Sequence, residues 1–159
     1  MLKLKAAVLY YSRTGKTAIA AKALADKIDG NLIEIRDLKN RKGVLGWLRA
    51  GRDGGGSKTT EIEPSSFDTS IYDTLCFGSP VWNSHPTPAF NTMIKNFEIT
   101  GKDIILFTTC GGKTCEKAIN IMKNMAKSGG GNVIKTFEVP ESGKKSGEDI
   151  KTAINNITF

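Results

Sequence analysis

Six residues near the N-terminus, Ser12-Arg13-Thr14-Gly15-Lys16-Thr17, directly follow the apolar run 6–10. The apolar run predicts a buried strand, and the hydroxyl and glycine residues after it predict a tight turn into a helix. Backbone N–H groups at a helix N-terminus have no partner within the helix, so they attract anions. Ser12, Thr14 and Thr17 add hydroxyl donors, and Gly15 permits a close backbone approach. The segment therefore predicts a phosphate-binding loop.

The end of this segment, Gly15-Lys16-Thr17, also matches the end of the phosphate loop of nucleoside triphosphatases. That motif needs another glycine five residues before Gly15. This chain has Tyr10 there, inside the predicted strand, so the longer loop that wraps nucleotide phosphates is missing. An ATP or GTP hydrolase is therefore disfavoured. A helix N-cap at Thr14 without any ligand remains the simpler alternative.

Length and composition set the broad class. The chain has 159 residues, 39% of them hydrophobic, and this predicts a single domain over residues 1–159. No apolar run approaches the roughly 20 residues of a membrane-spanning helix. No signal-peptide pattern precedes the first strand, so we expect a cytoplasmic protein.

Strand and helix patterns alternate along the chain, and one long segment interrupts them. Strands are expected at 4–10, 32–35, 71–77, 103–108 and 133–139, and helices at 15–29, after Pro86 and Pro88, at 113–127 and around 150–157. Residues 40–66 form a long basic loop, with one helical turn expected near Val44 to Arg49. Repeated strand–helix units with right-handed crossovers predict an α/β fold of three layers. We expect a doubly wound, five-stranded parallel sheet with helices on both faces.

The chain has three cysteines, a small and odd number that does not indicate a secreted disulfide framework. Cys76 lies in an apolar run and is expected to be a small core residue. Cys110 and Cys115 stand five residues apart across a glycine turn. A metal site is disfavoured because the lone histidine, His85, lies far off in the sequence. A redox pair stays open as the less favoured alternative.

The formal net charge is +7, and much of it is local. Basic residues gather between positions 39 and 58. A basic patch attracts acidic partners, although a solvated basic loop is the simpler interpretation. No signature of a helix-turn-helix, zinc finger or RNA-recognition module accompanies it, so we expect no specific nucleic acid partner. The basic residues between positions 39 and 58 are Lys39, Arg41, Lys42, Arg49, Arg52 and Lys58, against Asp53 alone.

Two further loops are expected beside the phosphate loop, because ligands of open α/β sheets bind beyond the carboxyl ends of the strands. The first is Gly78-Ser79-Pro80-Val81-Trp82-Asn83-Ser84-His85-Pro86, which holds a tryptophan on a proline-bounded turn. An aromatic side chain there suits stacking on a planar ligand, with core packing as the alternative. The second is Thr108-Thr109-Cys110-Gly111-Gly112-Lys113, whose glycine turn offers backbone N–H groups to the polar edge of a ring.

Taken together, these loops make the chain resemble the flavodoxin family over nearly its whole length. The FMN-phosphate loop of that family has the form Ser/Thr-x-Thr-Gly-x-Thr, which residues 12–17 match at every fixed position. Gly78-Ser79-Pro80-x-Trp82 is similar to the loop that lines the flavin ring. Thr109-Cys110-Gly111 looks like the loop whose backbone binds the pyrimidine edge. The resemblance implies noncovalent FMN and the strand order 2-1-3-4-5.

Carried over by position, the resemblance implies which residues hold FMN, with no side chain acting as a catalyst and no metal ligand. The residues implied to bind the phosphate are Ser12, Arg13, Thr14, Gly15, Lys16 and Thr17. The residues implied to contact the flavin ring are Ser79, Pro80, Val81, Trp82 and Asn83. Those implied to bind its pyrimidine edge are Thr109, Cys110, Gly111 and Gly112.

The chain departs from the family pattern in charge and at the ring. Flavodoxins are typically strongly acidic, whereas this chain has a pI near 9.4, so its redox partner proteins are expected to include acidic ones. The family's loop after the third strand often contains a glycine, and Ser79 to His85 contains none. A second stacking aromatic is also missing, since Lys113 and Thr114 occupy its place. One ring face is therefore bare or covered by Trp47.

These features favour an FMN-binding electron-transfer protein. The alternative is an FMN-dependent NAD(P)H oxidoreductase acting on quinones or similar acceptors. A bare ring face would admit a hydride donor, and the basic loop would attract its phosphate. A third, non-redox possibility is a flavodoxin-like binding module that has lost FMN. His85 is interpreted as a loop or helix-start residue, with a proton donor as the less favoured role.

Overall fold

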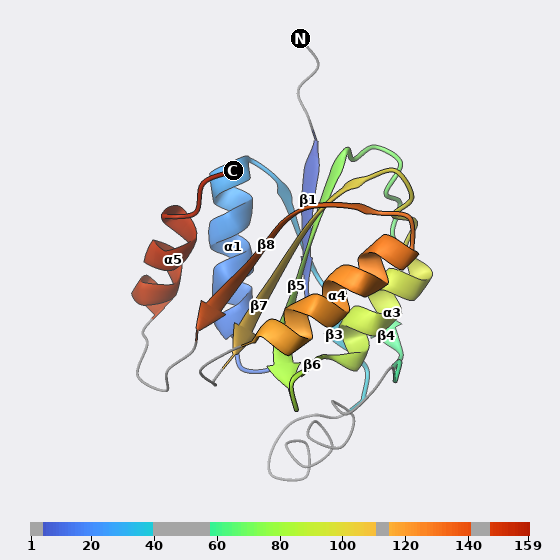
Figure 1. The fold of residues 1–159 in the computed structure, drawn as a ribbon, viewed down its shortest axis with the longest axis horizontal. Coiled ribbons are helices and arrows are strands. Elements are labelled where there is room, and N and C mark those ends of the chain that lie inside the picture. The colour runs from blue at the N-terminus through green and yellow to red at the C-terminus, as the bar shows by residue number, and fades with distance from the viewer. Residues whose placement is uncertain (1–4, 40–57, 111–114, 141–146) are drawn as a thin grey trace.

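Twelve regular elements form the described part of the computed structural model, which covers residues 5–39, 58–110, 115–140 and 147–159 (Figure 1). The strands are β1 (Ala6–Tyr10), β2 (Asn31–Glu34), β3 (Arg36–Asp37), β4 (Ile62–Glu63), β5 (Thr74–Trp82), β6 (His85–Pro86), β7 (Asp103–Cys110) and β8 (Asn132–Pro140). The helices are α1 (Lys16–Ile28), α3 (Pro88–Asn96), α4 (Glu116–Ser128) and α5 (Gly147–Asn155).

The central sheet is parallel along the order β2-β1-β5-β7-β8. This is the order 2-1-3-4-5 of the five predicted strands, so the predicted topology is confirmed. Helices α1 and α5 cover one face of the sheet, and α3 and α4 cover the other (Figure 1). The chain therefore has the predicted three layers, with the carboxyl ends of β1, β5 and β7 at one edge.

The strands explain this layering, because successive side chains of a strand point to opposite faces of its sheet. Leu9, Phe77 and Leu106 are fully buried in the core beneath α3 and α4. Their neighbours Val8 and Cys76 are fully buried in the core beneath α1 and α5. Strands buried on both faces carry nearly continuous apolar runs, and this is the pattern from which they were predicted.

Strand β5 differs from its prediction at both ends. It was expected at 71–77, but it begins at Thr74 and continues to Trp82, after which the chain turns back into β6. The turn signal Gly78-Ser79-Pro80 therefore lies within a strand. The carbonyl of Gly78 accepts a hydrogen bond from the Tyr11 N–H, at 3.2 Å between N and O. Pro80 faces the same side, beyond the end of β1, so its missing N–H costs the sheet no hydrogen bond.

The predicted loop at 40–66 is only partly described. Within it, β4 pairs antiparallel with β3 in a separate two-stranded sheet, and the guanidinium of Arg36 lies 2.6 Å from the Glu63 carboxylate. Residues 62–63 are thus a short strand where an irregular loop was expected. The helical turn expected near Val44 to Arg49, and Trp47, lie outside the described residues.

The other helices lie close to their predicted positions, with α3 starting at Pro88 and α4 at Glu116. Among the described residues, no helix is both long and apolar enough to cross a membrane.

The N-terminus of α3 is held by a buried hydroxyl, and its loss is expected to destabilise the fold. Thr87 is the N-cap of α3, and its Oγ1 accepts the Phe90 N–H and lies 3.0 Å from Ser79 Oγ. Thr87→Ala is expected to lower the free energy of unfolding by about 1–2 kcal/mol. Thr87→Ser keeps the hydroxyl and should lose much less. Urea denaturation followed by circular dichroism compares the two variants; equal losses would contradict a role for the hydroxyl.

Candidate functional site

The turn between β1 and α1 has the geometry of an anion-binding loop. The Ser12 Oγ accepts a hydrogen bond from the Gly15 N–H at 3.0 Å and closes the turn. Gly15 is the N-cap of α1 with a φ of +98°, a left-handed conformation that glycine adopts without strain. Apart from Gly15 and its two chain neighbours, no heavy atom of the described residues lies within 4 Å of where a Gly15 Cβ would stand, so this part of the chain leaves that side of the loop open.

This geometry corrects one alternative from the sequence. Thr14 was considered as a helix N-cap without a ligand, but the N-cap is Gly15 and it makes no side-chain cap hydrogen bond. Thr14 is exposed, and Ser12, Arg13 and Lys16 are half-buried beside it.

Tyr10 is the last residue of β1. It therefore lies inside the strand, as predicted when the loop of a nucleotide hydrolase was disfavoured. Burial and the nearby Glu34 carboxylate raise the pKa of Tyr10, so its hydroxyl stays neutral.

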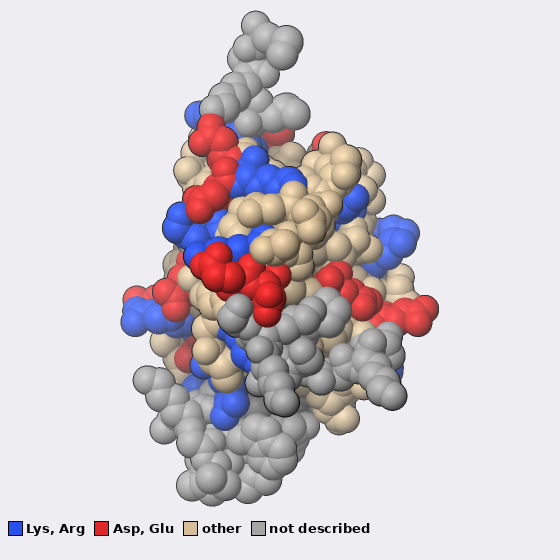
Figure 2. Space-filling model, turned by 90° about the vertical axis from the view of Figure 1, so that its left-hand side faces the viewer, with Lys and Arg blue, Asp and Glu red and all other residues tan. Residues whose placement is uncertain are grey.

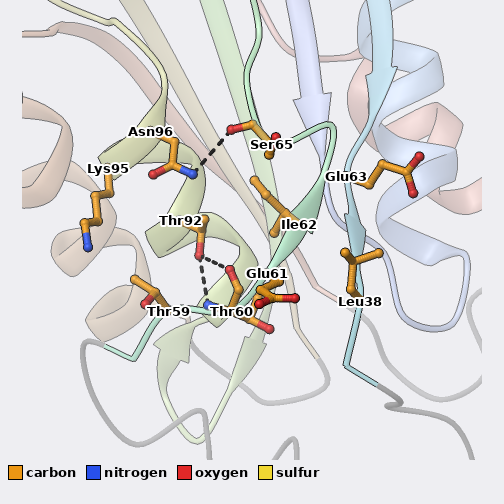
Figure 3. A pocket seen from close by; sticks show the side chains of 10 residues that line it. All are labelled: Leu38, Thr59, Thr60, Glu61, Ile62, Glu63, Ser65, Thr92, Lys95 and Asn96. Atoms are coloured by element: carbon orange, nitrogen blue, oxygen red, sulfur yellow. Dashed lines mark hydrogen bonds between the residues drawn. The ribbon is translucent and has the colours of Figure 1, made fainter.

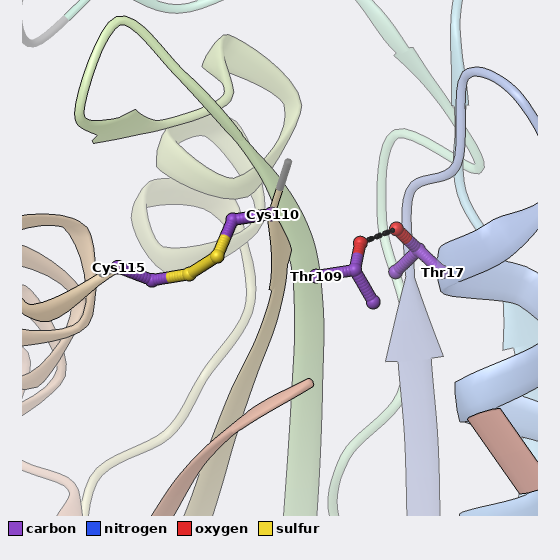
Figure 4. Close-up of a disulfide and its surroundings, with 4 residues drawn as sticks. All are labelled: Thr17, Thr109, Cys110 and Cys115. Carbon is purple, nitrogen blue, oxygen red and sulfur yellow. Dashed lines mark hydrogen bonds between the residues drawn. A yellow bond between two sulfur atoms is a disulfide. The ribbon is translucent and has the colours of Figure 1, made fainter. Parts of the chain in front are cut away.

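Two residues assigned to different parts of the site meet in the structure. Thr17, from the predicted phosphate loop, and Thr109, from the predicted ring edge, are 2% and 1% exposed. Their Oγ1 atoms lie 2.6 Å apart, and this hydrogen bond joins the first turn of α1 to the end of β7 (Figure 4). Two hydroxyls carry two hydrogens, and their mutual bond uses only one of them.

The hydrogen bond between Thr17 and Thr109 can be tested by removing one or both hydroxyls. Thr17→Val is expected to cost about 1–3 kcal/mol of unfolding free energy, because it leaves the buried Thr109 hydroxyl without this partner. The double variant Thr17→Val/Thr109→Val should lose less than the sum of the single losses, since both buried hydroxyls are gone. Urea denaturation of the wild type and the three variants completes the cycle. Strictly additive losses would contradict the pairing.

The second predicted loop is a two-residue β-hairpin between β5 and β6. Asn83 and Ser84 have φ values of +50° and +61°, as in the type I′ turns that close such hairpins. His85 Nδ1 lies 2.6 Å from the Asn83 carbonyl oxygen. A carbonyl oxygen only accepts, so His85 Nδ1 carries the hydrogen and donates it. His85 thus holds the turn, and it lies in the short strand β6 where a loop or the start of a helix was expected.

The ring of Trp82 lies at this edge of the sheet and is half-buried. It meets the Tyr11 ring edge-on, with centroids 5.7 Å apart and planes at 87°, and it also packs against the core beneath α3 and α4. Trp82 therefore has the core packing that the sequence left open, and it keeps exposed surface at the site. Tyr11 was missed from the sequence, although an aromatic directly after the first strand is the signal that would have found it.

The remaining residues of the hairpin differ in exposure. Pro80 and Val81 are half-buried and Asn83 is exposed. Ser79 is fully buried, and its Oγ accepts the Thr87 N–H at 3.1 Å. The Ser79 side chain therefore supports the start of α3, and any contact of this residue with a ligand falls to its backbone.

The third predicted loop is bounded by a disulfide. Cys110 is the last residue of β7 and Cys115 is the N-cap of α4; they are disulfide-bonded with their Cα atoms 6.3 Å apart (Figure 4). The redox pair that the sequence left open is thus a bonded pair. Gly111 and Gly112 lie outside the described residues. Within residues 5–39, 58–110, 115–140 and 147–159, no three His, Cys, Asp or Glu side chains lie close enough together to hold a metal ion.

A pocket of about 530 Å³ lies between the β3–β4 pair and α3 (Figure 3). Its polar groups largely bond to one another: Thr92 Oγ1 accepts the Thr60 N–H at 3.0 Å, and Asn96 donates to the Ser65 carbonyl. None of the predicted FMN residues lines this pocket. The candidate site is therefore the edge formed by residues 12–17, the β5–β6 hairpin and the end of β7.

Known proteins share this fold. The family model described as flavodoxin matches residues 5–157. A proposed flavoprotein from Bacteroides uniformis has a similar structure, with a TM-score of 0.81, 28% identity, and coverage of 98% of this chain and 100% of that one. No curated protein matches the chain.

Two more distant structures share the fold. A flavoprotein from Lactobacillus acidophilus, crystallised in complex with FMN, has a TM-score of 0.68 and 24% identity, covering 85% of this chain and 93% of that one. Oxidised flavodoxin 2 from Bacillus cereus has a TM-score of 0.60 and 16% identity, covering 96% and 94%. With a family model matched over nearly its whole length, this chain belongs to the flavodoxin family.

Proposed function

We propose that this protein binds FMN noncovalently and carries electrons between partner proteins. The observation that supports it most is the turn at residues 12–17. There a strand ends, a glycine takes a left-handed conformation with no contact at its Cβ position from the described residues beyond its chain neighbours, and a helix begins without a side-chain cap. Such a helix N-terminus suits a phosphate, because its first N–H groups and the helix dipole both face the anion.

The described residues fit the phosphate end of FMN. The first turn of α1 offers backbone N–H donors, and the exposed hydroxyl of Thr14 lies beside them. Arg13 and Lys16 would add positive charge near the anion. The Ser12 hydroxyl shapes the turn through its bond to Gly15. These residues would hold the phosphate.

The described residues also fit the ring end. Trp82 keeps exposed surface at the edge, and its contact with Tyr11 fixes the orientation of its ring. The hairpin turn that carries Asn83 is held by His85, so the polar groups beside the ring are preorganised. When bound, FMN would supply the redox chemistry, and the protein would supply binding, orientation and electrostatics. No side chain is assigned a catalytic role.

The charge of the chain bears on its partners. The formal net charge of +7 favours acidic partner proteins. The face of α1 and α5 does not present one sign, since acidic and basic side chains are interspersed there (Figure 2), including the pairs Lys22–Asp26 and Lys151–Glu148. We therefore assign partner docking to the edge of the sheet where the cofactor would bind.

The electron-carrier function can be separated from the enzymatic alternative by the source of electrons. The FMN-loaded protein is mixed with NADPH without oxygen, and the flavin absorbance near 450 nm is followed. A carrier should keep its colour for minutes with NADPH alone and bleach when dithionite or a flavodoxin reductase is added. Rapid bleaching by NADPH alone would contradict the carrier function and favour an NAD(P)H oxidoreductase.

The role proposed for Trp82 has its own test. Trp82→Ala is expected to weaken FMN binding roughly 10-fold, since an aromatic contact contributes about 1 kcal/mol or more. Trp82→Phe keeps a stacking ring and should retain most of the affinity. The dissociation constant follows from quenching of FMN fluorescence during titration. An unchanged affinity in Trp82→Ala would show that this ring acts only in core packing.

A further inference from the structure

The end of β7 is fixed from both faces of the sheet. Thr109 and Cys110 are successive strand residues, so their side chains point to opposite faces. Thr109 is hydrogen-bonded to Thr17 at the start of α1, and Cys110 is bonded to Cys115 at the start of α4 (Figure 4). The disulfide at Cys110 therefore directly follows Thr109, whose side chain is hydrogen-bonded to Thr17 of the proposed phosphate loop.

Both cysteines stand on regular structure that does not need the bond between them. Cys110 pairs with Pro140 in the β7–β8 ladder, and the carbonyl of Cys115 accepts the Ile119 N–H at 3.0 Å within α4. Their Cα separation of 6.3 Å lies within the range that disulfides span. Reduction would therefore leave the two thiols close together and ready to bond again.

The bridge closes only a short loop, which limits its effect to the neighbourhood of the site. Stabilisation by a disulfide falls as the closed loop becomes shorter, and these cysteines are only five residues apart.

Cys76 provides a contrast within the same chain. It is fully buried in the core beneath α1 and α5, and burial raises the pKa of its thiol to about 12. A thiol that stays protonated is a poor nucleophile, so Cys76 should take no part in exchange. Of the three cysteines, Cys110 and Cys115 form the bonded pair and Cys76 is free.

We propose that Cys110 and Cys115 form a reversible dithiol–disulfide couple that controls how tightly FMN is held. This inference rests on the proposed FMN-binding function. The reductant is a dithiol: it forms its own disulfide while the Cys110–Cys115 bond breaks, and two electrons and two protons pass to the protein thiols. The disulfide form holds the end of β7 against both α1 and α4 and binds FMN tightly. The dithiol form loses one of these links and binds FMN more weakly.

The first experiment counts thiols in the folded full-length chain. The protein is equilibrated with oxidised or reduced dithiothreitol, acid-quenched, unfolded, alkylated with N-ethylmaleimide and weighed by mass spectrometry. The oxidised form should carry one adduct, at Cys76, and the reduced form three, and reoxidation should restore one. A bond that resists reduction until the protein unfolds, or that never reforms, would overturn the proposal.

The second experiment measures FMN affinity in the two forms by fluorescence quenching. Reduction is expected to weaken FMN binding about 10-fold, because the end of β7 then loses its link to α4 and is less preorganised for the ligand. Cys110→Ala/Cys115→Ala should bind like the reduced form in either condition; alanine is chosen because both sulfurs are buried. Cys76→Ala, the matched control, should keep the full redox dependence.

The outcomes separate the two claims. Equal affinities of the oxidised and reduced wild type would overturn the inference and leave FMN binding intact. Absence of FMN binding in both forms would overturn the proposed function and, with it, control of FMN affinity. The thiol count would then still report whether the couple is reversible. Because the wild type serves both experiments, the test does not depend on the double variant folding.

Discussion

Gly78→Ala is expected to lower the free energy of unfolding by about 3 kcal/mol, as overpacking of a close-packed core does. Gly78 lies in β5, opposite Phe107 of β7. A Cβ at this position would overlap the Phe107 ring at its Cζ, far inside van der Waals contact. Phe107 is fully buried and stacked on Phe137, with centroids 5.3 Å apart, so its ring has little room to move. Urea denaturation measures the loss.

A second substitution identifies the cause of that loss. Phe107→Leu removes part of the ring that the new methyl would meet. The double variant Gly78→Ala/Phe107→Leu should therefore be more stable than the sum of the single losses predicts. A loss below about 1 kcal/mol in Gly78→Ala would show that the ring shifts easily, contrary to a close-packed core at this point.

Gly15→Val is expected to weaken FMN binding roughly 30-fold, or about 2 kcal/mol, through strain in the proposed phosphate loop. The φ of Gly15 is +98°, which a β-branched residue rarely adopts. Beyond its chain neighbours, its Cβ would meet no heavy atom of the described residues within 4 Å, so we expect backbone conformation, and not a clash, to decide the outcome. The turn must change shape, and the N–H groups of α1 then leave their positions around the phosphate.

Gly101→Val is the matched control for this substitution. Gly101 has a φ of +74°, and its Cβ would likewise meet no heavy atom of the described part of the chain within 4 Å, its chain neighbours apart. It precedes β7 at the opposite edge of the sheet, where its N–H donates to the Gly130 carbonyl. Both variants should lose similar stability in urea, but Gly101→Val should bind FMN like the wild type. Equal affinities in the two variants would contradict the phosphate role of residues 12–17.

Much of the fold follows from local patterns in the sequence. Apolar runs such as 6–10 and 103–108 predicted their strands because buried parallel strands must be apolar on both faces. The turn at residues 12–17 was also predictable, since a glycine between a strand and a helix has few other uses. The strand order came from the flavodoxin resemblance rather than from any single pattern.

Other features depend on contacts between distant residues and were missed for that reason. Pro80 reads as a turn residue, and only the end of β1 beside it allows β5 to continue. The pairing of β4 with β3 joins segments some 25 residues apart, and neither strand has a pattern of its own. At the site, the bond between Thr17 and Thr109 spans 92 residues. The sequence supplied both hydroxyls but not their contact.

The bonded state of Cys110 and Cys115 shows the same limit. Their spacing allowed a redox pair, a metal ligand set or separate thiols. The structure decides because β7 and α4 place their Cα atoms within disulfide range. Spacing alone could not show that one cysteine ends a strand and the other begins a helix.

The central claim is that residues 12–17 hold the phosphate of FMN, and a comparison of FMN with riboflavin tests it most directly. Both ligands carry the same ring, and only FMN carries the phosphate. Titration of the flavin-free chain, followed by flavin fluorescence, is expected to saturate at one FMN per chain. Riboflavin should bind at least about 100-fold more weakly, because it gives the helix N-terminus no anion to hold. Equal affinity for the two ligands, or no binding of FMN, would contradict the claim.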